Sequence, residues 1–162
     1  MLLYIVRHAW AADYGPSGDD RQRALTAEGR RRFADVVAWF VKRDFAPKAI
    51  VTSPLVRCVQ TAELLAEGSP ARPKVFEREE LAPGSDLRGL LKWMGQQDWT
   101  HDEICWVGHA PDVGRLTALL IGGGRAAVDF PKAAMAALRF DERPAEGAGE
   151  LRWLVTPRLL GK

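Results

Sequence analysis

Short apolar runs recur along the chain and are separated by longer amphipathic segments. Residues 2–6, 49–52 and 103–108 are continuously apolar or nearly so, and residues 74–76 form a shorter run of the same kind. Apolar runs without polar alternation are typical of strands buried on both faces of a parallel sheet. The pattern therefore predicts a sheet whose central strands are covered on both sides.

Apolar residues at helical spacing fill the segments between these runs. Thr26 is a predicted helix cap, and Ser53 is a predicted cap with Pro54 as the first helical residue. A further helix is expected over residues 87–96, and another begins at Pro111. The inward positions are Phe33, Val36, Val37 and Phe40 in the first helix, Leu55, Val59, Ala62 and Ala66 in the second, and Val113, Leu116, Leu119 and Leu120 in the last. The glycines at 122–124 are predicted to end the helix that begins at Pro111.

Two late apolar segments, residues 135–140 and 151–156, flank a polar loop. This arrangement predicts an antiparallel pair at one side of the sheet. Strands that alternate with helices are typical of α/β domains with helices on both faces. We therefore expect a three-layer α/β/α sandwich with a mostly parallel, mixed sheet. The length of 162 residues predicts one domain over residues 1–162.

Composition narrows the functional classes. The net charge of +2 is too small to indicate a nucleic-acid binder, and no apolar stretch is long enough for a membrane span. The first residues lack the features of a signal peptide. Cys58 and Cys105 have no metal-type spacing and are expected as buried, reduced thiols. We therefore expect a cytoplasmic protein that contacts neither nucleic acid nor membrane.

Basic residues stand at the ends of three predicted strands. Arg7 and His8 follow the first strand, Arg57 lies in the first turn after the second, and His109 follows the strand at 103–108. Ligands of open α/β sheets bind at the carboxyl ends of the strands. Arginine forks suit phosphate oxygens, and a neutral imidazole can attack phosphorus. These residues indicate a phosphatase with a histidine nucleophile that needs no metal and no cofactor.

The motifs VRHA, SPxxRCxQTA and VGHAP, in this order, resemble the histidine phosphatase superfamily, which has the phosphoglycerate mutase-like fold. The short chain is similar to the SixA-type phosphohistidine phosphatase branch. The resemblance implies that His8 is the phosphorylated nucleophile, that Arg7 and Arg57 bind phosphate, and that His109 holds the phosphoryl group. The segment RALTxxG also resembles this branch, and it implies that Arg23 reaches the phosphate pocket.

Two departures from the family pattern bear on the substrate. Ala9 stands where the superfamily usually has glycine, and it could narrow the pocket or strain the turn. Pro83 stands where many members carry the acid that protonates the leaving oxygen. Other carboxylates remain conceivable substitutes, namely Glu80, Asp86, Asp13 and Asp19. An alkoxide leaving group needs such an acid, whereas an imidazole leaves more easily. The absence of the acid at position 83 therefore favours phosphohistidine as substrate.

The leading hypothesis is hydrolysis of phosphohistidine on a protein, such as the histidine phosphotransfer domain of a bacterial signalling relay. One alternative is a phosphatase or mutase for small phosphorylated molecules, and another is a non-catalytic phosphate-binding module. Trp10 could line the mouth of the pocket. The arginines at 30–32 are interpreted as a solvated helix face that could steer an acidic partner.

Overall fold

The computed structural model describes residues 1–99 and 102–161 of the chain. These residues form a six-stranded sheet with the strand order β3-β2-β4-β1-β5-β6. The strands are β1 (Leu2–Arg7), β2 (Ala49–Thr52), β3 (Lys74–Glu77), β4 (Glu103–Gly108), β5 (Met135–Arg139) and β6 (Glu150–Val155). The α-helices are α1 (Ala27–Val41), α2 (Val56–Gly68), α3 (Leu87–Met94) and α4 (Asp112–Gly122). Each predicted strand and helix is present, with ends shifted by a few residues.

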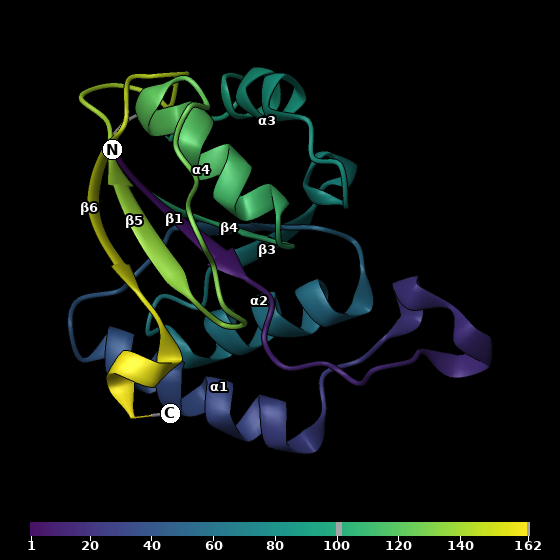
Figure 1. Cartoon of the computed structure of the whole chain (residues 1–162). Coiled ribbons are helices and arrows are strands. Elements are labelled where there is room, and N and C mark those ends of the chain that lie inside the picture. The colour runs from purple at the N-terminus through teal and green to yellow at the C-terminus, as the bar shows by residue number, and fades with distance from the viewer. Residues whose placement is uncertain (100–101, 162) are drawn as a thin grey trace.

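Helices cover both faces of this sheet (Figure 1). Helices α1 and α2 pack on one face, and α3 and α4 pack on the other. The side chains of β1 alternate between the two layers, with Tyr4 and Val6 in the first core and Leu3 and Ile5 in the second. Burial on both faces explains why this strand is continuously apolar. The predicted α/β/α sandwich is confirmed.

The strand directions bring several strand ends to one edge of the sheet. Strands β1, β4, β2 and β3 are parallel neighbours, whereas β5 is antiparallel to β1 and β6 is antiparallel to β5. The expected mixed sheet is therefore confirmed. Because β1, β2 and β4 end at the same edge, the residues that follow them meet there.

The helix starts differ in how well the sequence predicts them. Thr26 caps α1 as predicted, since its side chain accepts a hydrogen bond from the Gly29 amide. The prediction for α2 is wrong, because the N-cap is Leu55 and the helix begins at Val56. Ser53 lies before the helix, where its hydroxyl contacts the His109 ring. Helix α3 ends two residues early, at a glycine, which is a poor helix former.

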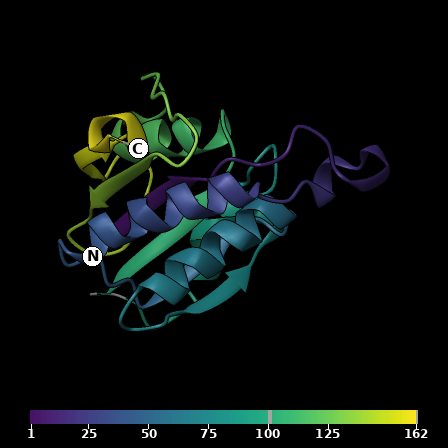
Figure 2. The ribbon, with the colours of Figure 1, turned by 90° about the horizontal axis from the view of Figure 1, so that it is seen from below.

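Two short 3-10 turns, η1 (Pro16–Gly18) and η2 (Asp20–Gln22), lie between β1 and α1. Figures 1 and 2 show that the segment carrying them extends away from the rest of the molecule. We call residues 13–23 the arm. Within the described ranges, no helix has both the length and the apolar character that a membrane crossing requires.

Candidate active site

A pocket of about 460 Å³ opens at the edge where β1, β2 and β4 end. It brings together all five residues that the sequence singled out, although they come from four separate parts of the chain. These residues are Arg7, His8, Arg23, Arg57 and His109. The remaining lining residues are Ala11, Pro83, Gly84, Ala110, Pro111, Asp112 and Lys132.

His8 is held by the sheet on both sides. Its backbone amide donates to the carbonyl of Gly108 at 3.0 Å, and its carbonyl accepts from the Ala133 amide at 3.2 Å. The ring atom Nδ1 lies 2.8 Å from the carbonyl oxygen of Ala9. Because a carbonyl only accepts, this contact requires the proton on Nδ1 and leaves the lone pair on Nε2. Nε2 thus carries the free lone pair that the predicted nucleophile requires.

Burial lowers the pKa of His8 from 6.5 to about 3, and the positive charges of Arg57 and Arg7 act in the same direction. The ring is only 6% exposed, so its charged form loses most of its hydration. The imidazole is therefore neutral near pH 7, which is the state a nucleophile needs.

Ala9 fits the turn without backbone strain, since its φ angle lies outside the positive region. Its amide donates to Thr61 Oγ1 at 3.1 Å, and that hydroxyl donates to the carbonyl of Arg57 at 2.6 Å. This relay connects the end of β1 to the first turns of α2. The strain that a methyl group could have caused at this position is absent.

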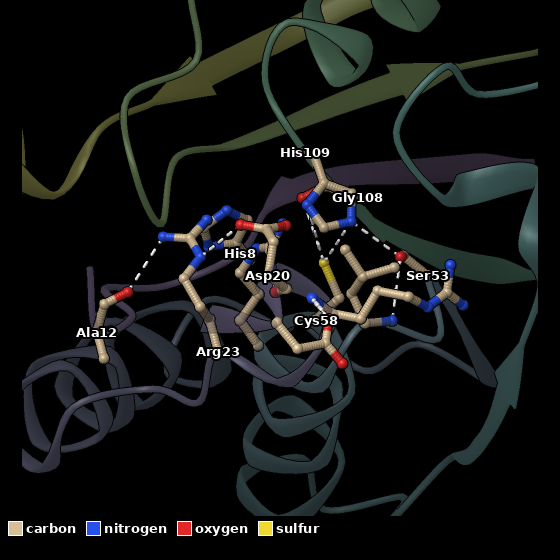
Figure 3. Close-up of polar contacts among 12 residues, drawn as sticks. His8, Ala12, Asp20, Arg23, Ser53, Cys58, Gly108 and His109 are labelled. Carbon is tan, nitrogen blue, oxygen red and sulfur yellow. Dashed lines mark hydrogen bonds and ion pairs between the residues drawn. The ribbon is translucent and has the colours of Figure 1, made fainter. Parts of the chain in front are cut away.

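His109 faces His8 across the pocket, with 5.4 Å between the ring centroids. Its Nε2 lies 2.8 Å from Ser53 Oγ and 3.4 Å from Cys58 Sγ. Figure 3 shows the other ring nitrogen on the side of His8 and Asp20. Burial, followed by the charge of Arg57, lowers the pKa of His109 to about 4. A dianion in the pocket would oppose this shift and favour the protonated ring.

The buried Arg57 and the half-buried Arg7 each have an unfilled hydrogen-bond donor. Arg7 donates from one terminal nitrogen to the carbonyl of Phe130 at 2.7 Å, and Arg57 donates to the carbonyl of Asp20 at 2.7 Å. The Nε atoms of both arginines are buried and have no partner. A buried donor without an acceptor costs about 1–3 kcal/mol. The site therefore favours an anion that supplies acceptor oxygens.

Asp20 is the main site residue that the sequence reasoning missed. Its carboxylate accepts from Arg57 at 3.0 Å and from Arg23 at 2.7 Å, so it bridges two predicted phosphate ligands (Figure 3). Desolvation opposes ionisation of Asp20, but the two arginines outweigh it and lower its pKa. The available signal was the position of Asp20 three residues before Arg23. The arm thus places a negative charge beside the pocket.

None of the four carboxylates considered as the missing acid lines the pocket. Glu80 pairs with Arg78, Asp86 and Asp19 cap helical turns, and Asp13 is exposed. Among the described residues, Asp112 is the only carboxylate in the lining. Its oxygens accept from the Gly84 amide at 2.9 Å and from Arg115 at 3.2 Å. Both carboxylate oxygens of Asp112 are engaged in these contacts, so Asp112 is suited to position the loop at Gly84.

Trp10 does not line the phosphate pocket, contrary to expectation. Its ring lies under the guanidinium of Arg32 in α1, and Arg32 Cζ is 3.9 Å from the ring centroid. Both residues line a neighbouring hollow. Lys132, which the sequence reasoning did not single out, lines both spaces. Across residues 1–99 and 102–161, no group of three or more His, Cys, Asp or Glu side chains could hold a metal ion.

Comparisons with known proteins agree with this geometry. An uncharacterized protein of Picosynechococcus sp. is 33% identical over 165 residues, which is 99% of each chain. The protein histidine phosphatase SixA, solved with tungstate, has a TM-score of 0.85 at 26% identity over 99% of each chain. The α-ribazole phosphatase of Shigella flexneri has a TM-score of 0.63 at 19% identity over 97% of each chain, which concerns the fold alone. Residues 3–113 match the histidine phosphatase superfamily (branch 1), and the chain belongs to that family.

Proposed function

We propose that this protein hydrolyses phosphohistidine on a partner protein through a phosphorylated His8. The observation that carries the proposal is a neutral histidine with a free Nε2 in a pocket that Arg7 and Arg57 also line. Among the described residues, the one carboxylate that lines this pocket is occupied by hydrogen bonds. The site thus has a nucleophile and phosphate ligands but no poised acid.

In the first step, Nε2 of His8 attacks phosphorus and the bond from phosphorus to the substrate imidazole breaks. The substrate ring takes a proton from solvent water on the nitrogen that does not carry phosphorus, and it departs as neutral imidazole. Arg7, Arg57 and a protonated His109 offset the charge on the phosphoryl oxygens, which is the main source of catalysis in phosphoryl transfer. This exchange replaces one P–N bond by a similar one, so the two states are close in free energy.

In the second step, water attacks the phosphorus atom and the bond to Nε2 of His8 breaks. The products are inorganic phosphate and the regenerated neutral imidazole. The pKa of about 3 for His8 supports this turnover, because the free ring remains unprotonated for the next attack. The match to the SixA structure at 26% identity supports phosphohistidine over a sugar phosphate.

The leaving group decides between the substrate classes. An alkoxide is a strong base and depends on a proton donor, whereas an imidazole of reference pKa about 6.5 departs readily. The carboxylates near the pocket, Asp20 and Asp112, are held by arginines. We therefore expect phosphohistidine turnover to exceed that of small phosphomonoesters by roughly a hundredfold, the usual worth of general acid catalysis.

A turnover assay with both substrate classes tests this proposal. Purified protein is incubated separately with a phosphohistidine-bearing protein and with each of several phosphomonoesters, and the phosphate released is measured. The His8→Ala variant should lose turnover by at least a thousandfold while it still binds inorganic phosphate. A surface variant, Lys42→Gln, should behave as wild type. Equal or faster turnover of one small ester would overturn the substrate assignment, and retained turnover in His8→Ala would overturn the covalent mechanism.

A further inference from the structure

A second hollow, of about 540 Å³, adjoins the phosphate pocket. Its walls come from Trp10 between β1 and the arm, from α1, from the loop before β5, and from Thr156 and the C-terminal turn η4 (Pro157–Leu160). The lining residues are Trp10, Arg32, Pro131, Lys132, Thr156, Pro157 and Arg158. We call this lining the basic shelf.

All three charged residues of the basic shelf are cations. Arg32, Lys132 and Arg158 form no ion pair with any residue in the described part of the chain. Many other arginines of the protein do pair, including Arg31 with Glu28 on the same helix. Among the described residues, no carboxylate forms an ion pair with these cations, so their donors are available to a partner.

Lys132 connects the shelf to the reaction site, because it lines both hollows. If the phosphoryl group of a substrate lies between His8 and His109, the groups next to it can reach the shelf past Lys132. The cations belong to three separate elements around a space larger than the phosphate pocket. Trp10, Pro131 and Pro157 add apolar surface between them. An extended segment with acidic and apolar side chains fits this lining better than one small anion does.

We propose that the basic shelf binds an acidic segment of the protein substrate beside its phosphohistidine. This inference rests on the proposed function, since it concerns the same substrate. The guanidinium of Arg32 stacks over the Trp10 ring, with Cζ 3.9 Å from the ring centroid, and this contact restricts its side chain before a partner binds. Exposed ion pairs are each worth about 0.2–1 kcal/mol. Two or three of them together correspond to about a tenfold preference for an acidic substrate.

Two phosphohistidine peptides of equal length test the inference. One carries Asp and Glu around the phosphohistidine, and the other carries Asn and Gln at the same positions. We expect kcat/KM to favour the acidic peptide about tenfold in the wild type, mainly through KM. In the double variant Arg32→Gln/Arg158→Gln this ratio should fall close to one. The control Lys42→Gln/Lys92→Gln removes two positive charges from exposed positions outside both hollows and should keep the ratio.

The outcomes separate the two proposals. Turnover of both peptides at equal efficiency by the wild type would overturn the shelf inference and leave the proposed function standing. The same holds if the double variant keeps the full preference, or if the control loses it equally, because the effect would then be net charge alone. Turnover of neither peptide, with phosphomonoesters hydrolysed, would overturn the proposed function itself.

Discussion

Asp20 contacts nitrogens of the two arginines that we propose as phosphate ligands, Arg57 and Arg23. Its carboxylate bridges Arg57 and Arg23 from the base of the arm. A substrate dianion meets the repulsion of this carboxylate and competes with it for the same donors. The contact thus weakens product binding as well as substrate binding, which suits an enzyme that must release phosphate.

We expect Asp20→Asn to bind inorganic phosphate roughly three- to tenfold more tightly, since the amide keeps the size but removes the charge; solvent exposure limits the gain. Calorimetric titration of the wild type and the variant measures the change. Asp19→Asn is the matched control, because Asp19 only caps η2 through the Arg21 amide. Weaker phosphate binding in Asp20→Asn would mean that the carboxylate instead holds the arginines in place.

The residues alone predicted the site side chains that lie at strand ends, whereas Arg23 on the arm was expected only from the family resemblance, and the other loop residues were missed. His8 and His109 come directly after buried strands, so the strand ends fix where they lie. Asp20, Asp112 and Lys132 depend on how the arm and two loops fold over the pocket, and no local pattern encodes that. The roles assigned to His8, Arg7, Arg57, His109 and Arg23 remain predictions until variants are measured.

At the scale of single elements, the start of α1 depends on a close approach between backbones. A Cβ atom built on Gly29 would lie 2.1 Å from the carbonyl oxygen of Trp10 and 2.9 Å from its Cβ. The Trp10 carbonyl also accepts from the Thr26 amide. The glycine in the RALTxxG segment thus lets the helix lie against the chain that leaves His8.

Gly29→Ala should destabilise the fold by about 1–3 kcal/mol, because backbone must move to admit the methyl group. The higher helix propensity of alanine offsets up to about 1 kcal/mol of this loss. Gly122→Ala in α4 is the matched control, since nothing lies within 4 Å of its Cβ position. Urea denaturation of the three proteins measures both changes. A similar free energy of unfolding for the two variants would contradict the role of the close approach.

Ser53 shows why the helix starts were harder to predict than the helices themselves. A serine before a proline is a common cap, but this hydroxyl contacts His109 Nε2 and accepts from the Leu55 amide at 3.3 Å. Contact with a histidine 56 residues away is invisible to a local pattern.

The inward positions of α1 are confirmed, because burial there follows helical spacing. In α2 the prediction was partly wrong: Val59 and Ala66 are half-buried, and the buried face is formed by Arg57, Cys58, Thr61, Ala62 and Leu65. In α4 only Leu119, which is half-buried, departs from the prediction.

At the scale of the whole molecule, folding buries two histidines in their neutral form. Their pKa values fall to about 3 for His8 and about 4 for His109, chiefly through burial, against about 6.5 in an unfolded chain. Above pH 6.5 both histidines are neutral in the folded and the unfolded chain, so their burial does not make the free energy of unfolding depend on pH. Below pH 6.5 the unfolded chain binds protons that the folded chain refuses, and stability falls with pH.

We therefore expect the free energy of unfolding to be nearly constant from pH 8 to 7 and to fall between pH 6.5 and about 4. Each histidine contributes up to about 1.4 kcal/mol per pH unit in that window. Urea titrations across this range measure the slope. The double variant His8→Gln/His109→Gln retains the other titrating groups and should show a shallower slope. An unchanged slope would mean that other groups, such as carboxylates, account for the acid sensitivity.

The sheet and the arm differ in how firmly they are held, and they should therefore differ in how many substitutions they tolerate. The backbone of His8 is fixed by hydrogen bonds to Gly108 of β4 and to Ala133 in the loop before β5, so the position of this residue is set by the core of the fold. The arm contacts the rest of the protein through a few polar links, such as Arg21 with Glu79 and Asp20 with Arg57. Substitutions in the arm should therefore cost little stability while they alter what surrounds the phosphate. Substitutions in the arm would thus let related proteins act on different substrates while the residues at the strand ends stay the same.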